Sequence, residues 1–182
     1  MDASFEKRIY TAEEYFAEMP GTNERIELIE GEIVYQGAPS VLHQTLVLET
    51  AVALRSHIKS KNGRCKVFPA PLDVKLDDHN VIQPDVFVVC DEKKLDGKRC
   101  NGAPDLAIEI VSGTGRNDYA KKLALYHDFG VREYWIIDPG YEKTLVYFWD
   151  ETEFPEIYPF DKPIPVRIWG GGFSITISEL TV

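Results

Sequence analysis

The 182-residue sequence has only three cysteines, Cys65, Cys90 and Cys100. Their number is odd and no two of them have C-x-x-C spacing, so the sequence supports neither a disulfide framework nor a structural zinc site. We therefore expect three free thiols in a reducing compartment, which favours a cytoplasmic location.

Long hydrophobic runs are also lacking. No apolar stretch approaches the roughly 20 residues that cross a bilayer. The N-terminus carries Asp2, Glu6, Lys7 and Arg8, which does not fit the apolar centre of a signal peptide. The sequence thus predicts a cytoplasmic protein that does not associate with membranes.

Positive charge is scarce, with 20 Lys and Arg against 30 Asp and Glu and a formal net charge of −10. This balance argues against nucleic-acid binding by broad neutralisation of phosphates. A local basic groove is still compatible with it. The segment with Lys93, Lys94, Lys98 and Arg99 is the best candidate for such a groove, and a solvated loop is the alternative.

The length and the ordinary hydrophobic and charged fractions predict one globular domain over residues 1–182. Helical and strand patterns alternate along the chain, which predicts an α/β (α+β) fold with a mixed central sheet flanked by helices. The segment from the strand of Glu109 through a helix to the strand of Trp135 has the length of a βαβ unit. Helices are expected at about 12–19, 41–61 and 117–129, a hairpin at 25–35, and strands at 67–68, 72–76, 85–89, 106–111, 133–138 and 144–149.

Two carboxylates interrupt apolar strand patterns. Glu109 lies within the run Leu106–Val111, and Asp85 directly precedes the run Val86–Val89. Burying a charge is costly without a partner. Two inward carboxylates suit Mg²⁺, which takes oxygen ligands and only one or two protein carboxylates. The alternatives are that such an acid caps a helix, pairs with an arginine, or lies in solvent at the end of a strand.

A lysine joins these acids on the helix that follows Glu109. At about 100° per residue, Lys122 falls inside the apolar arc of this helix and Lys121 falls outside it. Asp118 lies one turn before Lys122 and can pair with it. Lys122 is either a structural counter-ion or a group that orients water or stabilises a transition-state phosphate beside a metal.

These motifs occur in a specific order. ERIELIEGEIV, QPDVFVV, PDLAIEIVS, DYAKKLALY and VREYWIIDP together resemble the Uma-two family of bacterial restriction endonucleases, within the PD-(D/E)XK nuclease superfamily. The resemblance extends from about Tyr10 to Trp149 and implies a restriction-endonuclease-like fold. It also implies that Asp85 and Glu109 are metal ligands, with the carbonyl of Ile110 as a possible third.

The chain departs from the superfamily pattern in its lysine. Val111 stands where the acid-x-lysine motif has its lysine, and the resemblance implies that Lys122 on the next helix takes that role. Glu27 matches an upstream acid of the family. His43 lies where members carry a polar helix residue, although a core or surface histidine is the alternative. The family's Ser-Pro-Ser after the second acid is replaced by Ser-Gly-Thr-Gly at 112–115.

The resemblance implies a nuclease that hydrolyses phosphodiester bonds in DNA with Mg²⁺, or with Mn²⁺ in its place. The alternative is a catalytically silent, dimeric binding or regulatory module that keeps the nuclease fold, because fold alone does not fix function. The many aromatic residues of the C-terminal half predict a homodimer, since aromatic side chains are favoured at the centres of interfaces. They are Tyr134, Trp135, Tyr147, Phe148, Trp149, Phe154, Tyr158, Phe160 and Trp169.

Overall fold

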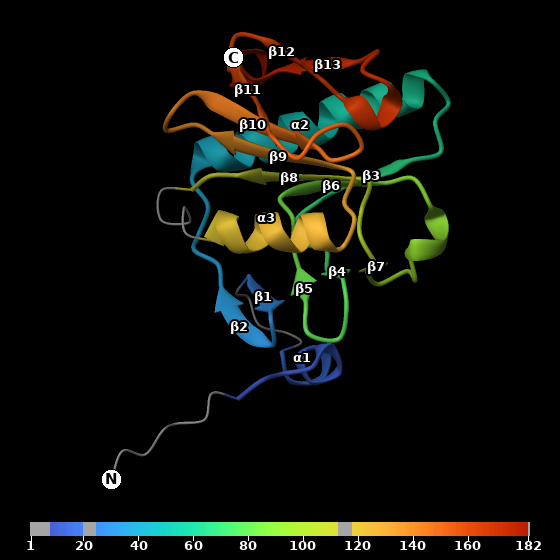
Figure 1. Ribbon diagram of the computed structural model, residues 1–182, viewed down its shortest axis with the longest axis vertical. Helices are drawn as coiled ribbons and strands as arrows, with labels where there is room; N and C mark the ends of the chain where they lie inside the picture. Colours follow the sequence, from blue (N-terminus) through green and yellow to red (C-terminus); the bar gives the residue numbers. More distant parts are fainter. Residues whose placement is uncertain (1–7, 20–24, 113–117, 182) are drawn as a thin grey trace.

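A six-stranded mixed sheet lies in the middle of the molecule and is seen edge-on in Figure 1. The structure is a computed structural model that describes residues 8–19, 25–112 and 118–181, without the side chains of 118–120. The strand order is β11-β10-β9-β8-β6-β3, in which only β8 and β9 run parallel. The strands are β3 (Lys66–Pro69), β6 (Val86–Val89), β8 (Leu106–Ile110), β9 (Glu133–Asp138), β10 (Lys143–Phe148) and β11 (Glu156–Pro159).

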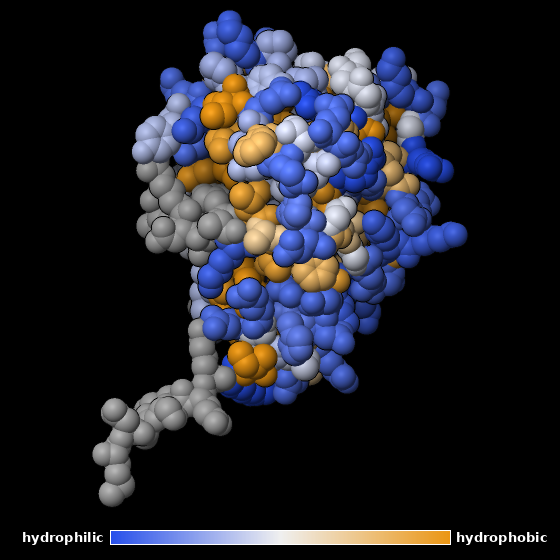
Figure 2. Space-filling view, in the orientation of Figure 1, coloured by the Kyte–Doolittle hydropathy of each residue, from blue (hydrophilic) through white to orange (hydrophobic). Residues whose placement is uncertain are grey.

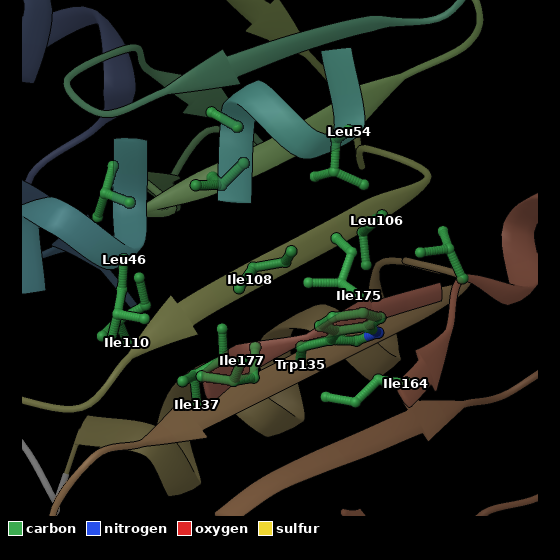
Figure 3. Packing of buried hydrophobic residues seen from close by; sticks show 14 of the residues in the cluster. Leu46, Leu54, Leu106, Ile108, Ile110, Trp135, Ile137, Ile164, Ile175 and Ile177 are labelled. Atoms are coloured by element: carbon green, nitrogen blue, oxygen red, sulfur yellow. The ribbon is translucent and has the colours of Figure 1, made fainter. Parts of the chain in front are cut away.

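Helices cover both faces of this sheet. Helix α2 (Val41–Ser60) and the C-terminal segment lie on one face, and α3 (Asp118–Asp128) lies on the other (Figure 1). Side chains of a strand alternate between its faces, so Ile108 and Ile110 pack toward α2 while Ala107 packs toward α3. Figure 3 shows the first of these layers, where Leu46 and Leu54 of α2 point toward the strands. By the same alternation, Glu109 belongs to the face of α3.

A second, five-stranded sheet lies on the α3 side of the molecule (Figure 1). Its order is β2-β1-β5-β4-β7, and helix α1 (Ala12–Glu18) packs against it. The strands are β1 (Ile26–Ile29), β2 (Glu32–Tyr35), β4 (Val74–Lys75), β5 (Val81–Ile82) and β7 (Cys100–Asn101). The remaining elements are the pair β12 (Pro163–Pro165) and β13 (Ser174–Thr176) and the 3-10 helices η1 (Glu92–Lys94), η2 (Arg167–Trp169) and η3 (Ile177–Thr181).

Local sequence signals set the ends of the elements that lead into the site. Thr11 forms a capping box with Glu14 at the start of α1, and the hydroxyl of Ser40 accepts a hydrogen bond from the amide of His43 at the start of α2. The β1–β2 hairpin turns through Glu30 and Gly31, which have φ angles of 52° and 77°. A two-residue turn with both φ angles positive matches the twist of the flanking strands.

The predicted α+β fold with a mixed sheet flanked by helices is confirmed. The strand expected at 72–76 is shorter and comprises only Val74–Lys75. No helix in the described part of the chain is both long and apolar enough to cross a membrane. Hydrophobic residues on the face shown in Figure 2 gather over the sheet and α3, between hydrophilic ones.

The prediction of three free thiols is wrong for two of them. Cys65 and Cys90 form a disulfide, and Cys100 is the free, buried cysteine. The reason is strand register: Lys66 pairs with Val89 across β3 and β6, so the residue before one strand lies beside the residue after the other. The sequence separation of 25 residues gives no hint of this proximity. The argument from free thiols to a reducing compartment therefore no longer holds.

Candidate active site

A small polar pocket lies where the two sheets and the start of α2 meet. Its volume is about 40 Å³, enough for a few molecules the size of water. The pocket collects side chains from segments far apart in the sequence. It is lined by Arg25, Gln36, Gly37, Pro39, His43, Asp85, Glu109, Ile110, Ser112 and Lys122.

Glu109 is the buried acid of β8. It is 5% exposed and its Oε1 accepts two hydrogen bonds, from Lys122 Nζ at 3.0 Å and from the hydroxyl of Tyr126 at 2.6 Å. Lys122 and Tyr126 are four residues apart on α3, so they lie on one face of the helix, one turn apart. Helix α3 thus fixes this carboxylate from one side, and neither hydrogen bond uses its second oxygen, Oε2.

Lys122 also joins Glu109 to the other sheet. Its Nζ lies 2.9 Å from Oε1 of Glu27 on β1. Glu27 is fully buried and accepts further hydrogen bonds from the amide of Gln83 at 2.7 Å and the side chain of Gln36 at 2.6 Å. Lys121 is exposed. The helix-face argument, which predicted Lys122 inside and Lys121 outside, is confirmed.

Asp85 lies directly before β6, and its two carboxylate oxygens contact three groups. Oδ1 is 3.2 Å from Arg25 Nη2, while Oδ2 is 3.1 Å from His43 Nε2 and 2.9 Å from the amide nitrogen of Ile110. His43 is buried on the first turn of α2. Glu27 and His43, which the family resemblance indicated, are therefore within the same cluster as Asp85 and Glu109.

The environments of the two strand acids move their pKa values in opposite directions. Burial raises the pKa of Glu109 to about 7; Lys122 opposes this shift, and Asp85 and Glu27 add to it. Burial would also raise the pKa of Asp85, but the hydrogen bond and charge interaction with His43, the amide of Ile110 and Arg25 hold it below its usual value. Lys122 stays charged, because two nearby carboxylates outweigh the effect of burial and raise its pKa. The cluster thus has one acid, Glu109, whose pKa lies near 7, beside another, Asp85, that is ionised at neutral pH.

The donor set fits a hard divalent cation. Asp85 and Glu109 line one pocket, and Mg²⁺ is typically held by one or two carboxylates, with water and substrate oxygens completing its shell. In an antiparallel pair the N–H and C=O of one residue point to the same edge. The carbonyl of Ile110 therefore lies on the edge where its amide contacts Asp85. Within the described residues, no three His, Cys, Asp or Glu side chains form a group that could hold a metal ion.

One predicted contact cannot be compared with the structure. Asp118 is the first residue of α3, but its side chain is outside the described residues. Its pairing with Lys122 stays a prediction. The same holds for the turn at 113–115 that replaces the family's Ser-Pro-Ser.

Sequence reasoning missed four residues of the cluster. Arg25 and Gln36 flank the β1–β2 hairpin, Gln83 precedes the Pro84–Asp85 pair, and Tyr126 lies on α3. The spacing of Tyr126 from Lys122 could have marked it, since a hydroxyl one turn from an inward lysine reaches the same partner. Arg25 carried no comparable signal, because its contact with Asp85 joins the two sheets. Gln36 contacts Glu27 within its own hairpin.

Comparisons with known proteins assign the chain to a family and a fold. Residues 12–178 match the Uma2 family, described as "Putative restriction endonuclease". The structure is similar to a crystal structure of a "putative nuclease belonging to DUF820" from Anabaena variabilis, with a TM-score of 0.76 and 23% identity over 91% of this chain and 94% of that one. No curated protein matches the chain. Because the family match spans nearly the whole sequence, the chain belongs to the Uma2 family of restriction-endonuclease-like proteins.

Proposed function

We propose that the protein is a Mg²⁺-dependent nuclease that hydrolyses phosphodiester bonds in DNA, with Mn²⁺ able to replace Mg²⁺. The observation that carries this proposal is the meeting of Asp85, Glu109 and Lys122 at one polar pocket. The description of the family as restriction endonucleases and the fold shared with the Anabaena variabilis protein support hydrolysis of phosphodiester bonds as the reaction class.

Each residue of the cluster has a distinct task in this proposal. Asp85 and Glu109, with the carbonyl of Ile110, hold the cation, which supplies Lewis-acid stabilisation of the phosphate and a bound water of lowered pKa. Lys122 places a fixed positive charge beside the pocket, where it stabilises charge that develops on the phosphate. Glu27 orients the ammonium of Lys122 through their 2.9 Å contact.

Other groups hold the ligands in place. His43 and Arg25 both contact the carboxylate of Asp85 and fix its orientation. The hydroxyl of Tyr126 does the same for Glu109. Groups around a metal site raise its affinity by holding the ligands in a fixed orientation.

The decisive experiment is plasmid cleavage with Mg²⁺ or Mn²⁺, compared among the wild type, Asp85→Asn and Asp161→Asn. Asp161 is exposed and lies outside the pocket, so its variant matches the charge change. We expect cleavage by the wild type and by Asp161→Asn, and loss of at least about a hundredfold in Asp85→Asn. Equal cleavage by all three proteins would indicate a contaminating nuclease. Absence of cleavage together with absence of divalent-ion binding would favour the silent binding or regulatory module.

We also propose that the protein is a homodimer, but for a different reason from the aromatic content. Tyr134, Trp135 and Phe148 are buried within the chain, and Phe154 is the strongly exposed member of that aromatic set. The exposed apolar side chains of α2 support a homodimer better. Val41, Leu48 and Val52 are 86%, 59% and 48% exposed. Their spacing of seven and four residues places them along one helix face.

Light scattering tests the homodimer. We expect twice the chain mass for the wild type at micromolar concentration and the mass of one chain for Leu48→Lys. The variant Lys59→Leu, on the same helix, serves as a control for changes in surface charge. A monomeric wild type would refute the proposal.

A further inference from the structure

Basic residues concentrate in a short segment of this acidic chain. Between Glu49 and Asp73 there is no acidic residue, although the formal net charge of the whole chain is −10. This interval begins within α2 and ends just before β4. Its cationic side chains and its one histidine lie close together in sequence: Arg55, His57, Lys59, Lys61, Arg64 and Lys66.

Most of these cations have no acidic partner. Lys66 forms an ion pair with Glu92 at 3.2 Å. Arg55, Lys59, Lys61 and Arg64 are exposed and form no ion pair with any residue that the structure describes. A positive charge in the last turn suits the negative end of the helix dipole, which accounts for Lys59. It does not account for Arg64, which follows the end of the helix.

The basic segment borders a pocket with an aromatic wall. The pocket measures about 460 Å³, and His57, Lys61, Arg64 and Trp169 are among its lining residues. The rings of His57, Trp169 and Phe173 form a triangle, with centroid distances of 5.0 Å from His57 to Trp169, 4.3 Å from His57 to Phe173 and 6.4 Å from Trp169 to Phe173. Trp169 is half-buried, so part of its side chain is open to a ligand. We call Lys61, Arg64 and Trp169, which line this pocket, the basic-aromatic patch.

The basic loop favoured by the sequence has fewer free charges. Lys94 donates a hydrogen bond to the carbonyl of Ala103 at 2.6 Å, and the guanidinium of Arg99 lies 3.2 Å from the ring centre of Phe16. Two of its four cations, Lys94 and Arg99, are therefore engaged in contacts within the chain. Lys93 and Lys98 are exposed and offer a matched comparison with the patch.

We propose that the basic-aromatic patch binds a single-stranded segment of nucleic acid. Proteins bind single strands by combining positive charge along the backbone with aromatic rings on which bases stack. Here Lys61 and Arg64 would contact phosphates while a base stacks against Trp169. A duplex with paired, stacked bases cannot use the aromatic wall, so the patch selects for unpaired strands or frayed ends.

The patch is separate from the catalytic pocket. On α2, His43 lines the catalytic pocket and His57 lines the pocket beside the patch. At 1.5 Å per residue, their separation of 14 positions corresponds to about 21 Å. This equals about six nucleotides of one strand in B-form spacing. The patch would therefore hold the substrate of the proposed nuclease several nucleotides from the scissile bond, and to that extent the inference rests on the proposed function.

The test is fluorescence anisotropy in EDTA with a labelled 12-nucleotide single strand and the matching blunt duplex. Wild type is compared with Lys61→Glu/Arg64→Glu and with Lys93→Glu/Lys98→Glu, which carry the same charge change at exposed positions. We expect the first variant to bind the single strand about tenfold more weakly or worse, and the second to stay within about threefold of wild type. The slope of log K against log salt should fall by about 1.4 in the first variant, from two lost phosphate contacts.

A second variant tests stacking. Trp169→Leu should lose the preference for the single strand over the duplex while it keeps its salt dependence, and circular dichroism reports whether it folds. If it does not fold, the exposed charge variants still decide the matter. Equal losses in both charge variants, or wild-type binding by Lys61→Glu/Arg64→Glu, would overturn the patch.

This assay is independent of catalysis, because it needs neither metal nor cleavage. A protein that binds through the patch but does not cleave DNA overturns the nuclease proposal alone. A protein that cleaves while Lys61→Glu/Arg64→Glu binds like wild type overturns the patch alone.

Discussion

Lys122 Nζ lies 3.0 Å from Glu109 Oε1, and both side chains are buried. This contact ties α3 to the central sheet at the candidate active site. The same ammonium also contacts Glu27, so one positive charge serves two carboxylates from two different sheets. The cluster therefore keeps an excess of negative charge that a divalent cation would neutralise.

Removing the Lys122 ammonium should destabilise the fold. Lys122→Met leaves Glu27 and Glu109 without their cation in a buried site, and breaking a buried pair in this way costs about 3–5 kcal/mol. Lys121→Met changes an exposed side chain and should stay within about 0.5 kcal/mol of wild type. Urea unfolding measures both. Similar losses in the two variants would show that the charge at Lys122 is not specifically required.

Tyr126→Phe should weaken divalent-ion binding. Without the hydrogen bond from its hydroxyl at 2.6 Å, the charged form of Glu109 loses support and its pKa moves up from about 7. At neutral pH more of the ligand is then protonated, so we expect Mn²⁺ affinity several-fold lower by calorimetry at pH 7. The gap should narrow at pH 8.5, whereas a purely structural defect would persist. Tyr147→Phe, on β10, is the control and should bind like wild type.

Mg²⁺ or Mn²⁺ should raise the melting temperature. A ligand at a hundred times its Kd stabilises the folded state by about 2.7 kcal/mol, which corresponds to roughly 5–10 °C for a chain of this size. Asp85→Asn should remove most of this shift and Asp161→Asn none of it. A melting temperature that does not change over a wide range of ion concentration would contradict the proposed metal site.

Glu133 should make stability depend on pH. Its oxygens accept hydrogen bonds from Trp135 Nε1 at 2.7 Å and from the amides of Arg167 and Ile168 at 2.8 and 2.9 Å. Burial nevertheless raises its pKa from 4.5 to about 7, while these hydrogen bonds oppose the shift. The folded state then holds a proton that the unfolded state has released between pH 4.5 and 7. Its contribution to stability is complete below pH 4.5 and is lost as pH rises to about 7.

Glu133→Gln tests this linkage, since an amide does not titrate. Between pH 5 and pH 7.5, the unfolding free energy of the wild type should fall relative to that of Glu133→Gln, by at most about 1.4 kcal/mol per pH unit. Urea unfolding at both pH values measures it. A shift in the opposite direction would mean that the three donors outweigh burial and lower the pKa.

Local sequence determined much of this protein. The period of α3 predicted that Lys122 points inward, and the apolar runs around Asp85 and Glu109 predicted their strands. The capping box at Thr11 lies at the start of the helix expected at 12–19, and the turn at Glu30–Gly31 lies within the hairpin expected at 25–35. These features depend on residues within one or two turns of each other, where periodicity and capping act.

Tertiary structure decided what the sequence left open. The disulfide of Cys65 with Cys90 follows from the register of β3 and β6, and the contacts of Arg25 and His43 with Asp85 join residues 60 and 42 positions apart. Packing also buried Tyr134, Trp135 and Phe148. Of the cations between Glu49 and Asp73, it left all but Lys66 without an ion pair among the described residues. No local pattern encodes these pairings, because register and packing between distant strands arise only when the whole core is assembled.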